Sequence, residues 1–254
     1  MLKALKPYLL PPLGIFLLLA GWHFYCVEFK VVTAVLPTPG LVFEAMWEKR
    51  ELLLSEGWVT MKETLYGFAL AFLFGVPLAV VVTNSSTLNL MFYPLLIALQ
   101  SVPKVALAPI LLVWLGTGIE SKLAIAWLVA FFPIVVDTAA GLRSTPRELL
   151  ELARSLRATR TQIFFKVQFP AALPFVVSGA KVAVTLAVIG AVIGEFVGSS
   201  EGLGNLLMSA SSQINAPLAF ASLFALAGMG MLAYLIVAII ERLLAPWLPH
   251  TEGH

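Results

Sequence analysis

The sequence predicts an all-α protein that crosses a membrane six times. The chain of 254 residues is 60% hydrophobic and only 12% charged, and a soluble domain does not carry this much apolar surface. Six apolar segments are long enough to span a bilayer, which needs about 20 helical residues. Arginines cluster in one connection between these segments. The predicted spans are 8–27, 64–83, 90–115, 121–141, 172–197 and 218–240.

The first span follows Lys3 and Lys6, as in the start of a signal peptide. Its apolar run is long, however, and no small-residue cleavage site follows it, so we expect an uncleaved peripheral helix. The chain then divides into three parts. Residues 1–62 hold this helix and an external loop, 63–245 form the core, and 246–254 form a short cytoplasmic tail.

The external loop contains an extended segment, Leu36–Gly40, and then an amphipathic run, 41–54. This run mixes Leu, Phe and Trp with Glu and Lys, which is typical of a helix lying at the membrane interface. A role in the scaffold is favoured over a role in binding, and the sequence leaves both open.

The basic residues predict the orientation of the chain. With the N-terminus inside, nine lysines and arginines fall on the cytoplasmic side and five on the external side. Cytoplasmic connections carry the excess of positive charge. The sequence therefore predicts that both termini and the arginine-rich connection, 142–170, are cytoplasmic.

Composition argues against several kinds of site. The single cysteine, Cys26, allows no internal disulfide or cysteine metal cluster. The three histidines are scattered, Asp137 is the only aspartate, and no combination of these residues suits a nucleophile or a metal site. The Gly-x-x-x-x-Gly-Lys-Ser/Thr motif is absent, so the chain cannot hydrolyse ATP alone. We expect no enzymatic activity, no bound cofactor and no nucleic-acid partner.

The arginine-rich connection is patterned as two short helices. Thr145 and Glu148 form a capping-box pattern, and Thr159 and Gln162 form a second one. A capping box satisfies the free N–H groups at the start of a helix. The two patterns predict helices within 146–168.

The first of these helices has an apolar face that the connection itself cannot cover. On another face, Glu151 is spaced to form ion pairs with Arg147 and Arg154. A solvated loop that merely carries positive charge would explain the arginines, but not the apolar stripe or the capping boxes. An amphipathic helix that docks into the groove of a partner explains both. The stripe consists of Leu149, Leu152, Ala153 and Leu156.

These residues resemble a known signature. Glu151-Leu152-Ala153, a joint six residues after the glutamate, and then Val167, Phe169 and Pro170 resemble the EAA loop of permease subunits in bacterial ABC importers that depend on a binding protein. The resemblance continues into the flanks FFPIVVDTAAGL and GEFVGSSEGLGNLL and covers about residues 60–245. It is closest to permeases for sulfonates, taurine, nitrate and pyrimidine- or riboflavin-like compounds.

The resemblance implies a type I ABC importer core in the inner membrane of a bacterium. Two permease copies, expected to be identical, would enclose a path that opens alternately to each side. A cytoplasmic ATPase dimer, which binds ATP and magnesium, would drive them, and an external binding protein would deliver a small organic anion or heterocycle. The residues that the resemblance assigns to ATPase coupling are Glu148, Glu151, Leu152, Ala153, Arg154, Leu156, Arg157, Ala158, Thr159 and Pro170.

Two residues depart from the family pattern. Leu152 replaces an alanine, and Arg157 stands where the family usually has a glycine. That glycine would take a left-handed conformation at the end of the first helix, and another residue there costs about 1 kcal/mol. Either the joint near Arg157–Ala158 is rebuilt, or Arg157 gains a contact on the ATPase.

Charged residues inside the predicted spans are candidates for the substrate path. Lys104 lies between Pro103 and Pro109, which break the third span and are tolerated where a cavity or a neighbouring helix is present. A cation there suits an anionic or polar substrate, and the alternative is a lysine that snorkels or pairs with a carboxylate. Glu195, beside Gly194, either lines an outer gate or pairs with a cation. Pairing is favoured, and Lys104 is one candidate partner.

Other residues in the spans are assigned structural roles. Asp137 is expected to cap a helix at the interface or to pair with an arginine, and Lys181 to snorkel to the inner face. Small residues along the fifth span allow close helix contacts and predict a central position at a homodimer interface. They are Ser178, Gly179, Ala183, Ala187, Gly190, Ala191 and Gly194.

A secondary transporter or channel that works alone would explain the intramembrane charges equally well. It would be expected to contain repeats with matched broken helices, which the sequence does not show, and it gives no role to the patterned connection. A membrane-embedded enzyme is disfavoured because no catalytic combination is present. The importer permease is therefore the favoured interpretation.

Overall fold

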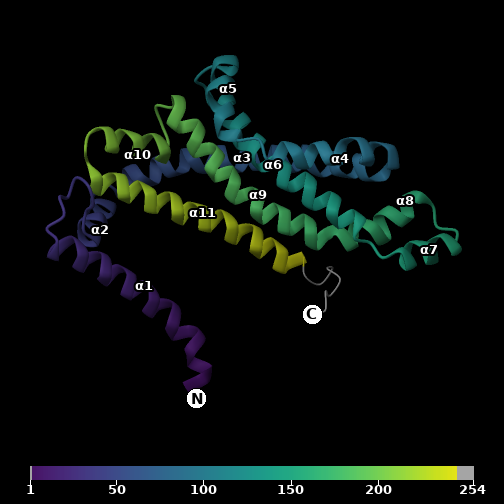
Figure 1. Cartoon of the computed structure of the whole chain (residues 1–254), viewed down its shortest axis with the longest axis horizontal. Coiled ribbons are helices and arrows are strands. Elements are labelled where there is room, and N and C mark those ends of the chain that lie inside the picture. Colours follow the sequence, from purple (N-terminus) through teal and green to yellow (C-terminus); the bar gives the residue numbers. More distant parts are fainter. Residues whose placement is uncertain (1, 245–254) are drawn as a thin grey trace.

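The computed structural model describes residues 2–244, and its elements are all helical (Figure 1). Five helices are long and apolar enough to cross a membrane, and one bent pair brings the candidate spans to six. α7 and α8 lie at one end of the bundle, and α2 and α10 lie at the other. The elements are α1 (Leu2–Glu28), α2 (Pro39–Glu48), α3 (Arg50–Asn84), α4 (Ser86–Gln100), η1 (Lys104–Leu107), α5 (Ala108–Leu115), α6 (Ile119–Arg143), α7 (Arg147–Ser155), α8 (Arg160–Ile163), the π-helical η2 (Phe164–Gln168), α9 (Phe169–Gly198), α10 (Leu203–Ser212) and α11 (Ala216–Leu244).

The core is built on close contact of α6 with α3 and α9. Gly67 on α3 and Gly190 on α9 both face Ala126 of α6. A Cβ at Gly67 would lie 2.5 Å from the Ala126 Cβ, and a Cβ at Gly190 would lie 2.7 Å from the Ala126 Cα. The small residues predicted for a homodimer interface are, except for Ser178, buried inside this chain. The predicted central position is therefore confirmed, but these small residues pack against α6 of this chain rather than against a second copy.

Gly190→Ala is expected to lower the free energy of unfolding by about 1–3 kcal/mol, because the added methyl group would overlap the backbone of α6. Gly230→Ala in α11 is the matched control, since nothing lies within 4 Å of a Cβ at that position. Thermal unfolding of the two variants in the same detergent measures the difference. Equal midpoints would contradict the close packing of α6 on α9.

The third span is sharply bent, as its prolines predict. α4 ends at Gln100 and the chain resumes in η1 at Lys104, with an angle of 87° between the two halves. Pro103 has no N–H to continue the helix and disfavours helical geometry in the residue before it. The bend brings the Lys104 ammonium to the ring of Phe132 on α6.

α3 differs from its predicted start. It runs without a break from Arg50, whereas the sequence places the second span from residue 64 and a domain boundary after residue 62. The predicted interfacial helix is divided as well, because α2 ends at Glu48 and the rest of the run opens α3. The first half of α3 carries polar side chains that other helices satisfy, and this polarity conceals it from a search for apolar spans.

α1 is peripheral, as the sequence predicts. Most of its apolar side chains from Leu10 onward are exposed, and the helix leans away from the bundle toward its N-terminus (Figure 1). Trp22 packs near Phe220 and Phe224 of α11, with ring centroids 6.0 and 6.1 Å apart. These contacts hold the second half of α1 against the core. The predicted tail, 246–254, lies outside the described residues.

Candidate functional site

The connection between α6 and α9 opens with α7, a helix of nine residues, none of them buried. The Thr145 hydroxyl donates to the Leu142 carbonyl oxygen at 3.2 Å, so Thr145 belongs to the end of α6. The N-cap of α7 is Pro146, and no side-chain hydrogen bond caps the helix. The predicted capping box between Thr145 and Glu148 is therefore wrong.

The second capping box is confirmed. The Thr159 Oγ1 accepts a hydrogen bond from the Gln162 backbone N–H at 3.3 Å, and the Gln162 Oε1 accepts one from the Thr159 N–H at 2.8 Å. The helix that starts here does not end within the connection. It continues through η2 into α9, so Arg160–Gly198 is one helix of 39 residues. Only α7 is a separate short helix, and Pro170 lies inside the continuous one.

The joint between α7 and α8 is a left-handed turn at Arg157, whose φ is +57°. The Arg157 N–H donates to the Arg154 carbonyl at 2.9 Å, and the Ala158 N–H donates to the Ala153 carbonyl at 3.0 Å. These two bonds form the Schellman motif, in which glycine is usual. The joint is therefore not rebuilt, and an arginine adopts the conformation that favours glycine.

Arg157→Gly is expected to stabilise this joint by up to about 1 kcal/mol, because glycine adopts a positive φ without steric strain. Arg157→Ala removes the guanidinium but keeps the strain, and is the matched control. Hydrogen exchange of the Ala158 and Thr159 amides measures the effect. We expect slower exchange in the glycine variant alone, and equal exchange in all three proteins would contradict the strained joint.

α7 presents uncovered apolar side chains. Leu149, Leu152 and Leu156 are 46%, 56% and 74% exposed. Within the described part of the chain the ion pairs are those of Lys49, Lys122 and Lys181. The predicted pairs of Glu151 with its neighbouring arginines are therefore not formed in that part of the chain, and the three leucines remain exposed there.

A cavity of about 480 Å³ lies beside α7. Pro146 and Leu149 line it from the start of α7, and Val167, Pro170 and Phe175 line it from the continuous helix. This groove places Pro170 next to the exposed leucine stripe. The residues assigned to coupling are thus brought together on α7, at its joint and along this groove.

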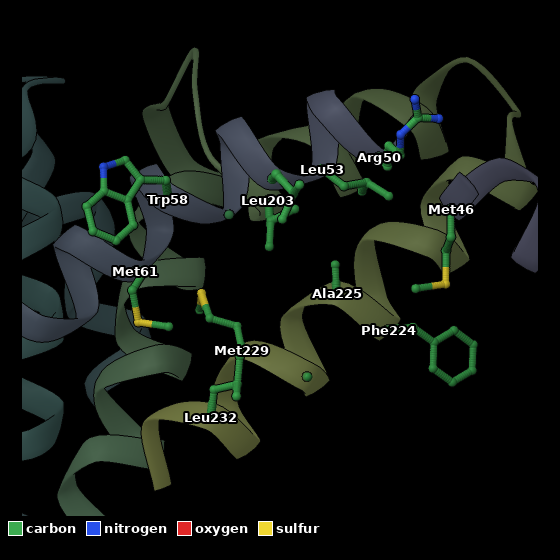
Figure 2. A pocket seen from close by; sticks show the side chains of 13 residues that line it. Met46, Arg50, Leu53, Trp58, Met61, Leu203, Phe224, Ala225, Met229 and Leu232 are labelled. Carbon is green, nitrogen blue, oxygen red and sulfur yellow. The ribbon is translucent and has the colours of Figure 1, made fainter. Parts of the chain in front are cut away.

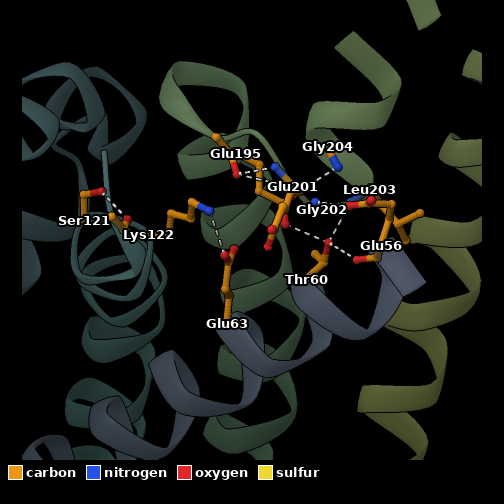
Figure 3. A network of polar contacts seen from close by, with 12 residues as sticks. Glu56, Thr60, Glu63, Ser121, Lys122, Glu195, Glu201, Gly202, Leu203 and Gly204 are labelled. Carbon is orange, nitrogen blue, oxygen red and sulfur yellow. Dashed lines mark hydrogen bonds and ion pairs between the residues drawn. The ribbon is translucent and has the colours of Figure 1, made fainter. Parts of the chain in front are cut away.

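At the opposite end of the bundle, Glu195 holds the N-terminus of α10 (Figure 3). Its buried carboxylate accepts hydrogen bonds from the Thr60 hydroxyl at 2.6 Å and from the Gly204 N–H at 2.5 Å. The Thr60 Oγ1 in turn accepts from the Leu203 N–H at 2.9 Å. The first N–H groups of a helix lack partners within it and favour negative charge. Glu195 therefore fixes α10 to α3 and α9.

Three more side chains extend this cluster, and we call the set Glu56, Thr60, Glu63, Lys122 and Glu195 the α10 clamp. Glu56 accepts a hydrogen bond from the Gly202 N–H, and Gly202 takes a φ of +100° that favours glycine. The Glu63 Oε1 lies 3.1 Å from the Lys122 Nζ in a buried ion pair. The clamp thus joins α3, α6, α9 and α10.

Several intramembrane residues differ from their predicted roles. Glu195 is held by N–H and hydroxyl donors, and among residues 2–244 it forms no ion pair with a cation, Lys104 included, so the favoured pairing is not found there. A Cβ at Gly194 would lie 3.1 Å from the Lys122 Cα, so Gly194 serves the contact between α9 and α6. Lys181 forms an ion pair with Glu241 near the C-terminal end of α11, and its predicted extension to the inner face stays a prediction.

Lys104 lines a cavity of about 390 Å³, and Asp137 lines the same cavity from α6. The Lys104 Nζ donates to the Gln100 carbonyl at 2.8 Å and lies 5.2 Å from the centre of the Phe132 ring. Asp137 forms no ion pair with an arginine among the described residues, and it lies inside α6 rather than at its end. Sequence reasoning therefore found Lys104 but missed Asp137 as a cavity residue.

A further cavity, of about 530 Å³, lies between the start of α3 and α11 (Figure 2). Its lining is largely apolar, as Leu53, Met61, Met229 and Leu232 show, and Arg50 lies toward one side of it. Specific sites add a few convergent polar groups to an apolar wall, and this groove lacks such a set. It suits lipid chains better than a polar substrate.

The family of the chain follows from comparison with known proteins. Residues 71–249 match the model of the family described as binding-protein-dependent transport system inner membrane component. A probable ABC transporter permease protein of Haemophilus influenzae is 35% identical over 92% of this chain and 94% of its own length. The formylaminopyrimidine transport permease protein ThiX of Halalkalibacterium halodurans is 39% identical over 71% of this chain and 72% of its own.

Two further comparisons agree. The riboflavin transport system permease protein RibX of Chloroflexus aurantiacus is 35% identical over 93% of this chain and 89% of its own. Among solved structures, the inward-facing MetNI methionine ABC transporter superposes with a TM-score of 0.68 at 25% identity, over 78% of this chain and 98% of the other. The chain is a multi-pass protein of the bacterial inner membrane, and it belongs to the family of permease components of binding-protein-dependent ABC importers.

Proposed function

We propose that this chain forms the substrate path of an ATP-driven importer that works by alternating access. Two copies of the chain, with both termini in the cytoplasm, enclose the path. A dimer of cytoplasmic ABC ATPases binds ATP and magnesium and docks on the connection between α6 and α9. An external binding protein delivers the substrate.

The observation that carries this proposal is the uncovered leucine stripe of α7. A stripe of three leucines, each at least 46% exposed, is unfavourable in water and requires a covering surface. The other face of α7 carries Arg147, Arg154 and two glutamates, so its charges balance. A helix that lies on an anionic membrane is instead rich in lysine and arginine. A protein groove is therefore the better partner for α7.

The geometry of the second half of the connection supports coupling. α8 is continuous with α9 through η2, so a displacement of α8 moves α9 with it. The two hydrogen bonds of the Arg157 joint fix the turn that leads from α7 to α8. A partner that grips α7 therefore acts on a core helix through one short turn.

The substrate is proposed to be a small organic anion or heterocycle of the sulfonate, taurine, nitrate or pyrimidine and riboflavin type. The relatives named for formylaminopyrimidine and riboflavin transport support the heterocycles. The path is proposed to include Pro103 and Lys104 at the bend of the third span. Glu195 and Gly194, which the sequence also assigns to the path, contribute to it through the α10 clamp and the helix contact that they form.

The test is an affinity purification of the tagged chain from detergent-solubilised native membranes, with mass spectrometry of the bound proteins. We expect an ATPase with a Gly-x-x-x-x-Gly-Lys-Ser/Thr motif to co-purify, and Leu152→Glu to abolish its binding by placing a charge in the stripe. Val35→Glu is the matched control, because Val35 is also exposed, at 73%, and belongs to the loop between α1 and α2. α2 lies at the end of the bundle opposite α7 (Figure 1). A chain that purifies alone, where a known importer keeps its ATPase, would indicate a self-sufficient transporter or channel.

A further inference from the structure

The cavity at the bend of the third span brings together two charges of opposite sign. Lys104 reaches it from η1, Asp137 reaches it from α6, and Val182 and Leu186 of α9 form an apolar wall. Its volume of about 390 Å³ is near the lower end for ligand pockets. The cavity is therefore of a size that suits a single-ring or short-chain compound.

Neither charge is neutralised by an ion pair within residues 2–244. The Lys104 ammonium has three donors, and one of them is directed to the Gln100 carbonyl. Charged side chains inside membrane spans are costly and usually face a path or a partner. Two opposite charges that line one cavity without pairing offer a donor and an acceptor to the same ligand.

The packing of α9 leaves room for the Asp137 side chain. Gly179 lies next to it, and a Cβ at Gly179 would be 2.8 Å from the Asp137 Cβ and 3.1 Å from its Oδ2. A larger residue at this position would displace the carboxylate or separate α9 from α6. Glycine therefore permits both the close helix contact and the position of Asp137 at the cavity.

We propose that this cavity binds a substrate that carries an amino group together with an anionic or strongly accepting group, which rests on the proposed role of the chain as an importer path. Asp137 accepts the hydrogen bond of the amino group, and Lys104 donates to the acceptor. An aminopyrimidine with a carbonyl group and a short aminosulfonate share this chemistry.

The proposal narrows the substrate class. An anion without an amino group, such as nitrate or ethanesulfonate, would bind Lys104 but would be repelled by the Asp137 carboxylate and leave it without a donor. Such a mismatch is disfavoured more strongly than a missing apolar contact, because a charged group remains unsatisfied. Taurine and ethanesulfonate differ by the amino group and therefore form a matched pair of probes.

Binding is measured by saturation-transfer NMR on the complete permease–ATPase complex in nanodiscs, without the binding protein. The probes are taurine, ethanesulfonate and a formylaminopyrimidine. We expect the amino-bearing probes to bind and ethanesulfonate to bind at least about tenfold more weakly than taurine. The tighter binder of taurine and the formylaminopyrimidine shows whether the cavity prefers an aminosulfonate or an aminopyrimidine.

Substitutions of Asp137 and Lys104 test which part of the substrate each side chain binds. Asp137→Asn is expected to reduce the ratio of taurine affinity to ethanesulfonate affinity at least about tenfold. Lys104→Gln is expected to weaken the binding of both sulfonates. Lys181→Gln, which removes a lysine of α9 that does not line the cavity, should leave binding unchanged. Equal binding of the two sulfonates to the unsubstituted complex, no binding of any probe, or a preference unaffected by Asp137→Asn would each overturn the proposal. The failure of the ATPase to co-purify would instead refute the importer itself.

Discussion

Glu195→Ala is expected to lower the free energy of unfolding by about 2–5 kcal/mol, because it leaves the buried Gly204 N–H without its acceptor and removes the shorter of the two hydrogen bonds that the Thr60 hydroxyl donates. The variant should also free the N-terminus of α10, because Glu195 accepts a hydrogen bond from the Gly204 N–H in its first turn. Thermal unfolding in detergent measures the first effect. Limited proteolysis across 199–215 measures the second.

A neighbouring glutamate provides the control for this prediction. Glu201 lies in the loop before α10, and its side chain is exposed, so Glu201→Ala should change the free energy of unfolding by less than about 0.5 kcal/mol. Glu195→Gln keeps the shape and one acceptor oxygen, and should lie between the two. If Glu195→Ala behaves like Glu201→Ala in both assays, the α10 clamp does not hold α10.

Glu151→Lys is expected to uncouple the permease from its ATPase, with a loss of at least about tenfold in the ATPase activity stimulated by the loaded binding protein. Glu151 is exposed on α7 and forms no ion pair within the described residues, so its charge is available to a cation of the partner. Reversing one charge of a pair across an interface costs several kcal/mol, and each 1.4 kcal/mol corresponds to a factor of ten.

The matched control is Glu44→Lys, the same reversal on α2 at the other end of the bundle. Both substitutions are on the surface, so neither should shift the midpoint of thermal unfolding appreciably. Stimulated ATPase activity and uptake at the unsubstituted level in Glu151→Lys would refute the role of Glu151. A loss of equal size in both variants would point to a general effect of charge rather than to docking through α7.

Local signals in the sequence predict the fold well, because membrane spans are marked by the length of their apolar runs. The bend at Pro103 and the capping box at Thr159 are also local and are confirmed. The box at Thr145 is not formed, because the end of α6 competes for the Thr145 hydroxyl. The start of α3 is missed for a different reason. Its polar residues are satisfied only by partners far along the chain.

In the candidate site, too, features that depend on local sequence could be predicted, and features that depend on contacts between distant residues could not. The leucine stripe of α7 is a periodic pattern and could be recognised directly. The role of Glu195 depends on Thr60, 135 residues away, and no spacing rule connects two such positions. Asp137 and Lys104 line one cavity only because the bend after α4 and the close approach of α9 form it. Until that geometry is known, an isolated aspartate near a helix end is better explained as a cap.

The unbroken helix from Arg160 to Gly198 also has a mechanical consequence. Its 39 residues correspond to a rod of about 58 Å at 1.5 Å per residue. One end begins at the joint with α7, and the other carries Glu195 close to its last turn. A tilt imposed at the first end therefore moves the end that contacts α10, except for the part that bending at η2 or at Pro174 absorbs.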